Sequence, residues 1–145
     1  MDKQIIKNII IEKQIAIPNY KLVHRDFLFG DKSNYILVGI RRAGKSYLLY
    51  QDIQTRLNKG EQSAQDILYI NFEDERLSSL KAEELGTILD SYMELYPGKQ
   101  PFVYLDEIQN IEGWEKFARR LADSQYRVMI TGSNAKMLGK EMYST

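Results

Sequence analysis

Four short, largely apolar runs, separated by longer segments of helical periodicity, constrain the fold of this chain most strongly. The runs occupy residues 35–38, 67–72, 102–105 and 128–131. Strands of a parallel sheet are apolar at consecutive positions because helices cover both of their faces. The sequence therefore predicts an α/β domain with four parallel strands.

The segments between these runs carry the helical signal. Residues 45–58, 82–96 and 114–123 are the expected helices, and Trp114, Phe117 and Leu121 recur at helical spacing in the last of them. Strands that alternate with helices are typical of βαβ units with right-handed crossovers. All of these elements fit within one domain.

The N-terminal segment has a different pattern. Its isoleucines between residues 5 and 11 are interrupted by Lys7 and Asn8, which indicates an amphipathic helix and not a membrane span. We expect residues 1–30 to form a helix and an arm that pack on a core formed by residues 31–145.

Composition narrows the function classes. The 145 residues include 20 basic and 20 acidic side chains, so the whole chain lacks the net positive charge of a general nucleic-acid binder. Cysteine is absent, which excludes disulfides and thiolate metal sites and suggests a cytoplasmic protein.

A phosphate-binding pattern lies where the first strand gives way to a helix. The eight residues from Gly39 to Ser46 fit G-x-x-x-x-G-K-[ST], which requires this strand–loop–helix context. Lys45 is expected to reach the β- and γ-phosphates of a nucleotide, and the Ser46 hydroxyl is expected to bind Mg²⁺. The predicted nucleotide-binding residues are Gly39, Ile40, Arg41, Arg42, Ala43, Gly44, Lys45, Ser46 and Tyr47.

Two simpler interpretations compete with parts of this assignment. Gly44 could belong to a glycine turn that caps an ordinary helix. Arg41 and Arg42 lie at the tip of the loop, where they either raise the local positive potential as solvated charges or contact a neighbouring subunit or domain.

A pair of acidic residues directly after the third predicted strand favours nucleotide hydrolysis. Phe102-Val103-Tyr104-Leu105 is followed directly by Asp106 and Glu107. A buried strand ending in this pair places Asp106 to bind Mg²⁺ and Glu107 to polarise a water in line with the γ-phosphate. The alternative is a strand that ends in a solvated acidic turn. The chain has no Asn-Lys-x-Asp motif for guanine, so ATP or ADP is the expected nucleotide.

Four segments together resemble a known family. GIRRAGKSYLL, LYINFEDERL, VYLDEIQNIEGWEKFARRL and VMITGSNAKML, in this order and spacing, are similar to the prokaryotic AAA-type ATPases of the archaeal ATPase group. The resemblance implies a three-layer αβα sandwich with a parallel central sheet and a nucleotide at the carboxyl ends of its strands. It also implies an N-terminal ATPase core followed by a C-terminal domain.

The same resemblance suggests a sensor residue at the end of the fourth strand, which in this family lies between the strands that carry the two Walker motifs. Thr131, Ser133 and Asn134 are the candidates for contact with the γ-phosphate or the attacking water. Each could instead cap the next helix, since serine and asparagine are preferred at that position.

The chain ends at Thr145, before the fifth strand and the arginine-bearing lid that family members carry. We therefore expect an incomplete core with very slow hydrolysis and an open sheet edge that invites self-association. Two function classes remain: an ATPase that drives conformational change in an attached domain or partner, and a nucleotide-dependent switch or scaffold with negligible turnover. A small-molecule phosphotransferase is a distant third. Nucleic-acid contact is expected only through a C-terminal domain, and membrane contact is not expected.

Overall fold

The four predicted strands form one parallel sheet. The computed structural model describes residues 1–23, 34–39 and 44–133. Its strands are β1 (Tyr35–Val38), β2 (Ile67–Asn71), β3 (Phe102–Asp106) and β4 (Arg127–Gly132), in the order β1-β4-β3-β2. The expected strand positions are confirmed to within one residue at each end, and β4 lies between β1 and β3 as the family resemblance implied.

The helices agree with the sequence pattern to within one residue at each end, with one exception. Helix α2 (Lys45–Asn58) has the predicted bounds, and α4 (Glu115–Asp123) begins one residue late. Helix α3 (Gly86–Leu95) is shorter than expected because residues 82–84 form a separate 3₁₀ turn, in which the Glu84 carboxylate accepts from the backbone N–H of Lys81. Single 3₁₀ turns also occupy Ile17–Asn19, Ala64–Asp66, Glu75–Leu77 and Ile108–Asn110.

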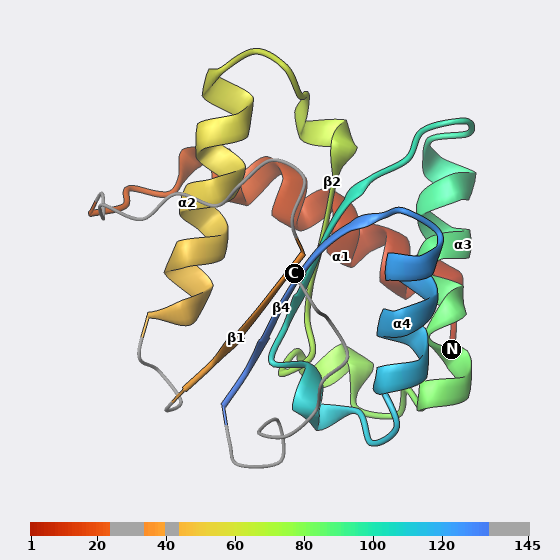
Figure 1. Ribbon diagram of the computed structural model, residues 1–145. Coiled ribbons are helices and arrows are strands. Elements are labelled where there is room, and N and C mark those ends of the chain that lie inside the picture. The colour runs from red at the N-terminus through yellow and green to blue at the C-terminus, as the bar shows by residue number, and fades with distance from the viewer. Residues whose placement is uncertain (24–33, 40–43, 134–145) are drawn as a thin grey trace.

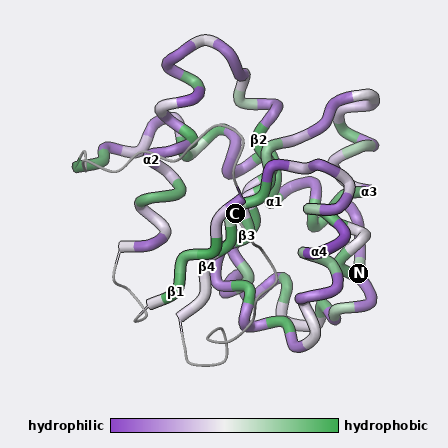
Figure 2. The backbone as a smooth tube through the Cα atoms, viewed as in Figure 1, coloured by the Kyte–Doolittle hydropathy of each residue, from purple (hydrophilic) through white to green (hydrophobic). Residues whose placement is uncertain are grey.

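The sheet is covered on both faces. Helix α2 lies on one side, and α3 and α4 lie on the other (Figure 1). The strands are the most continuously hydrophobic part of the described chain, as the green tube in Figure 2 shows. This arrangement confirms the expected three layers, helix on sheet on helix.

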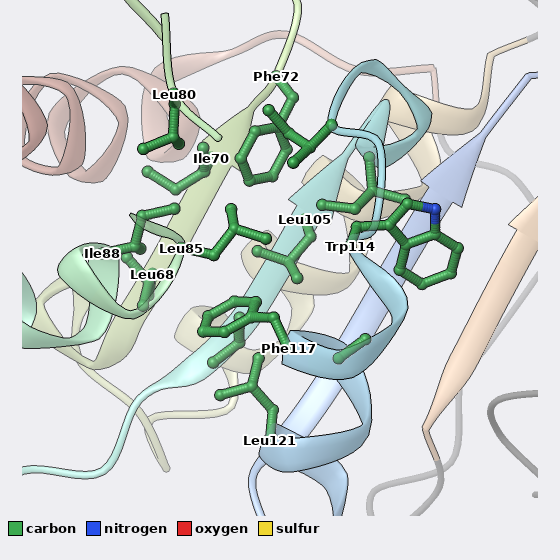
Figure 3. Packing of buried hydrophobic residues seen from close by; sticks show 14 of the residues in the cluster. Leu68, Ile70, Phe72, Leu80, Leu85, Ile88, Leu105, Trp114, Phe117 and Leu121 are labelled. Carbon is green, nitrogen blue, oxygen red and sulfur yellow. The ribbon is translucent and has the colours of Figure 1, made fainter. Parts of the chain in front are cut away.

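Two hydrophobic clusters fill the spaces between these layers. The larger one lies between the sheet and α3 and α4, where Leu105 of β3 packs among Ile88, Trp114 and Phe117 (Figure 3). Trp114 is buried, as are Phe117 and Leu121, with which it recurs at helical spacing. The smaller cluster lies under α2 and joins Leu49 and Ile53 to the opposite face of the strands.

Helix α1 (Lys3–Ala16) begins after Asp2, whose carboxylate caps the helix by accepting from the N–H of Gln4. Ile6, Ile9 and Ile10 of this helix belong to the larger cluster, whereas Ile17, directly after the helix, belongs to the smaller one. The Gln14 amide donates to the carbonyl oxygen of Ile67 at 2.9 Å. Because β2 is an edge strand, this contact satisfies a backbone acceptor that lies at the sheet edge.

The alternation of side chains along the strands determines which residues lie on the sheet face that α2 covers. Tyr104 belongs to the α2 cluster, and Val103 and Leu105 belong to the other. The two-residue period therefore places Asp106 on the same face as Tyr104. The same reasoning places Tyr69 of β2 and Thr131 of β4 on this face.

Candidate functional site

The segment between β1 and α2 is the first part of the site. The N–H of Gly39 donates to the carbonyl of Gly132 at 3.3 Å, so the β1–β4 pairing continues one residue past the strand. Gly44 has a φ of 87° and precedes the first residue of α2. Glycine adopts this left-handed backbone without steric cost, which explains its place at the helix start. Ile40, Arg41, Arg42 and Ala43 lie outside the described residues.

Lys45 occupies the first turn of α2 and is buried. A Cβ added at Gly39 would lie 3.9 Å from the lysine Cδ and 4.0 Å from its Nζ. The side chain therefore folds back toward the end of β1. This position keeps the ammonium beside the loop that was predicted to hold phosphates.

A cavity of about 330 Å³ opens at the start of α2. Lys45 and Ser46 line it from the helix, and Glu107 lines it from the end of β3. The structure thus brings Glu107 together with Lys45 and Ser46, which lie some 60 residues earlier in the chain. The remaining lining residues are Gly44, Tyr47 and Tyr50.

Asp106, the last residue of β3, is fully buried and directly precedes Glu107 of the cavity wall. The Tyr69 hydroxyl from β2 donates to its Oδ2 atom, and the Thr131 hydroxyl from β4 donates to its Oδ1 atom. A buried carboxylate is stable only when hydrogen bonds replace its hydration. Both neighbouring strands supply one such bond.

Glu107 has a strained backbone and a restrained side chain. Its φ of 56° and ψ of 47° are left-handed, a conformation that costs a non-glycine residue on the order of 1 kcal/mol. Its N–H donates to the Thr131 hydroxyl oxygen at 2.9 Å. Its Oε2 atom accepts from the Ser133 hydroxyl and from the Gln109 amide.

The three sensor candidates differ in position. Thr131 lies inside β4 and is fully buried, so it caps no helix, and its hydroxyl is engaged by Asp106 and Glu107. Ser133 follows β4 and donates to Glu107. Asn134 lies outside the described residues. Both described candidates therefore contact the acidic pair directly.

Sequence reasoning missed the tyrosines beside the acidic pair. The Tyr50 and Tyr69 hydroxyl oxygens are 3.2 Å apart, which links the cavity wall to the buried Asp106. Burial raises the pKa of both phenols above the ordinary value, so both stay protonated and can donate. The two-residue period indicates which face Tyr69 occupies, but only the strand order shows that β2 lies beside β3.

Other polar residues at the end of β2 have structural partners. The Asn71 side chain accepts from the N–H of Glu73, and the Asp74 side chain accepts from the N–H of Arg76, each at 2.9 Å. Arg76 also donates to Asp74 and to Glu12 of α1. These contacts are those of an ordinary turn and helix cap.

The chemistry of the site fits a phosphate ligand with a divalent cation. A helix start, the Lys45 ammonium and the Ser46 hydroxyl are donors suited to phosphate oxygens. Hydroxyl and carboxylate oxygens are the ligand type that Mg²⁺ prefers, and Ser46 and Asp106 provide one of each. A carboxylate has about four lone-pair positions, so Asp106 retains acceptor capacity beside its two hydroxyl donors.

Among the described residues, no helix combines the length and apolar character that crossing a membrane requires.

Comparison with known proteins agrees with the fold. The chain is 37% identical over 145 residues to an uncharacterized protein of Methanocaldococcus jannaschii, covering 98% of this chain and 31% of that protein. It is 36% identical over 111 residues to an uncharacterized protein of Haemophilus influenzae, covering 74% of this chain and 27% of that one. The chain thus spans about a third of the length of these curated relatives.

A family model described as an AAA domain matches residues 31–145, which include β1 to β4 and the cavity residues. The match covers most of the chain, and the four-stranded parallel sheet between helical layers agrees with an AAA-like P-loop fold. The chain therefore belongs to the AAA family of nucleotide-binding, ATPase-like domains.

Proposed function

We propose that this protein binds Mg·ATP and hydrolyses it to ADP and phosphate, and that the reaction drives a conformational change in an attached domain or partner. The observation that carries the proposal is the cavity in which Lys45, Ser46 and Glu107 meet, with the buried Asp106 directly before Glu107 in the chain. Family membership supports the nucleotide, and the residues around the cavity suggest the chemistry.

Binding would depend mainly on the start of α2. The Lys45 ammonium would pair with phosphate charge, and the N–H groups of the first helical turn would donate to phosphate oxygens. Ser46 and Asp106 would hold Mg²⁺, which neutralises phosphate charge when it is bound. Gly39, Gly44 and Tyr47 complete the described part of the proposed nucleotide site. Residues 40–43 are also proposed for it, although they lie outside the described residues.

Glu107 is the proposed group that polarises the attacking water. Its left-handed backbone is held by the N–H bond to Thr131, and its carboxylate is held by Ser133 and Gln109. In the described part of the chain both donors reach Oε2, so Oε1 is the oxygen proposed to face the water. A strained backbone at such a position is typical of functional sites.

A nucleotide-dependent switch with negligible turnover is the second candidate. The same two donors to Glu107 favour it, because a carboxylate already engaged by Ser133 and Gln109 is less available to a water. In that case nucleotide binding, and not hydrolysis, would change the conformation of a partner.

Phosphate release with Mg·ATP distinguishes these two functions. We expect slow release by this chain, and faster release by a longer protein that contains the same residues, measured with and without DNA. Release by this chain that rises per molecule with protein concentration would support an arginine donated by a neighbouring copy, a role worth about 10³–10⁵ in rate. Nucleotide binding without release in any of these samples would support the switch.

Two partner assignments remain predictions. Strand β1 is one edge of the sheet, and Val38 is 40% exposed there, so self-association through this edge is proposed. Contact with nucleic acid is proposed only for parts of a longer protein outside this chain.

A further inference from the structure

Two buried tyrosines stand side by side on the sheet face that α2 covers. Tyr69 of β2 is paired in register with Tyr104 of β3, and each is 1% exposed. Each hydroxyl donates to a carboxylate, but the acceptors differ. Tyr104 donates to Asp52 of α2 at 2.6 Å, whereas Tyr69 donates to Asp106.

The Tyr69 hydroxyl belongs to a directed chain of hydrogen bonds. It donates to Asp106, so its oxygen is the acceptor for the Tyr50 hydroxyl at 3.2 Å. On the other side, the N–H of Glu107 donates to Thr131, which donates to Asp106. Both series of hydrogen bonds end on the carboxylate of Asp106. Hydrogen bonds linked in series polarise and strengthen one another.

These two donors determine how Asp106 is held. Tyr69 engages Oδ2 from one neighbouring strand and Thr131 engages Oδ1 from the other. A carboxylate restrained at both oxygens cannot rotate without breaking a buried hydrogen bond. Outer partners of this kind orient metal ligands and tune the affinity for the metal.

We propose that Tyr69 is a positioning residue that orients Asp106 for Mg²⁺ in the nucleotide site. The proposal rests on the proposed function, in which Asp106 and Ser46 hold the cation. Tyr50 extends the same support to α2, because it lies one helical turn after Ser46 and its hydroxyl contacts Tyr69. The hydroxyl chain thus connects the elements that carry both proposed ligands.

The test is the Mg²⁺ dependence of nucleotide binding by the Tyr69→Phe variant. This change removes only the hydroxyl, so Asp106 loses one of its two restraints. Calorimetry with a β,γ-imido analogue of ATP, first in EDTA and then at rising MgCl₂, separates phosphate binding from the contribution of the cation. We expect unchanged affinity in EDTA and an increase of about ten- to a hundredfold in the half-saturating Mg²⁺ concentration.

Tyr104→Phe is the matched control. It removes a phenol of equal burial from the neighbouring strand, and its acceptor Asp52 has no role in the proposed site. We expect it to lower the melting temperature about as much as Tyr69→Phe does and to leave the Mg²⁺ dependence at the wild-type value. Asp106→Asn shows how the Mg²⁺ dependence changes when the proposed Mg²⁺ ligand itself is lost.

The possible outcomes separate the two proposals. Equal Mg²⁺ dependence in wild type, Tyr69→Phe and Tyr104→Phe, with a large loss in Asp106→Asn, would overturn the role of Tyr69 alone. Equal loss in both phenylalanine variants would also overturn it, because it would show a general effect of destabilising the sheet. Failure of the wild-type protein to bind the analogue in either buffer would overturn the proposed function, and the Tyr69 assignment with it.

Discussion

Thr131 lies one strand away from Asp106 and donates its hydroxyl hydrogen to the Oδ1 atom of that carboxylate. The same hydroxyl oxygen accepts from the N–H of Glu107 at 2.9 Å. One side chain of β4 thus restrains both acidic residues at the end of β3.

The variant Thr131→Val tests this relationship through stability. Valine keeps the shape of threonine but leaves the buried N–H of Glu107 without its acceptor, which costs about 1–3 kcal/mol of unfolding free energy. Urea denaturation followed by circular dichroism measures the change. Thr131→Ser retains the hydroxyl and should lose less unfolding free energy. A valine variant as stable as wild type would contradict the assigned hydrogen bonds.

The variant Glu107→Gln tests the proposed chemistry. An amide keeps the shape of the side chain but polarises water far less than a carboxylate, and loss of such a group typically lowers the rate by about 10²–10⁴. We expect Mg·ATP binding to be retained while phosphate release falls, both measured on the longest available form of the protein. Exposed Glu112 provides the control, Glu112→Gln, which should keep both properties. Equal release by Glu107→Gln and wild type would exclude Glu107 from catalysis.

The buried ion pair under the sheet gives a separate prediction for stability. Arg56 Nε lies 2.9 Å from Asp52 Oδ2, and both side chains are over 90% buried. Removing one partner of such a pair costs about 3–5 kcal/mol, because the other charge stays buried without its counterion. Arg56→Met should therefore lower the urea midpoint strongly, while Lys116→Met on the exposed face of α4 should not. Similar midpoints for these two variants would show that the pair contributes little.

The attachment of α1 to α3 should weaken in acid. Hydrogen bonds from Lys3 and Lys7 lower the pKa of Glu94 to about 2, from an ordinary value of 4.5. A carboxylate with a lowered pKa stabilises the folded state above its unfolded pKa, and this contribution is lost as pH falls from about 4.5 to 2. The group is exposed, so the effect should be small and should shrink in high salt.

Melting temperatures between pH 6 and 2.5 check this prediction, with Glu94→Gln as the comparison. The difference between wild type and the variant should narrow as the pH falls. A difference that stays constant over this range would mean that the ion pairs of Glu94 do not stabilise the fold.

Much of the fold follows from local pattern. The apolar run at residues 35–38 and the helix at residues 45–58 have the predicted bounds because a continuous apolar run and a 3.6-residue period are both properties of neighbouring residues. The phosphate-binding pattern and the Asp106-Glu107 pair are likewise readable from short segments. That both occur at strand ends explains why they meet across the cavity.

The rest depends on contacts between distant residues. The sequence does not show that Gln14 of α1 donates to the edge of β2, or that Tyr69 of β2 reaches Asp106, because both contacts require the strand order and the register. The left-handed backbone of Glu107 is also invisible in the pattern, since only the hydrogen bonds from neighbouring elements maintain it.

Nucleotide binding by wild type and Lys45→Ala is the most direct test of the account. Lys45 is the described ammonium in the cavity wall, so its loss should remove most of the affinity for Mg·ATP, with a decrease of about two orders of magnitude or more from charge-assisted bonds worth roughly 3 kcal/mol. Lys59→Ala, at the opposite end of α2 and exposed, should bind as wild type does. Calorimetry should therefore show tight binding for wild type and Lys59→Ala, and binding weaker by about two orders of magnitude or more for Lys45→Ala. Equal affinity in all three would contradict a nucleotide site at the start of α2.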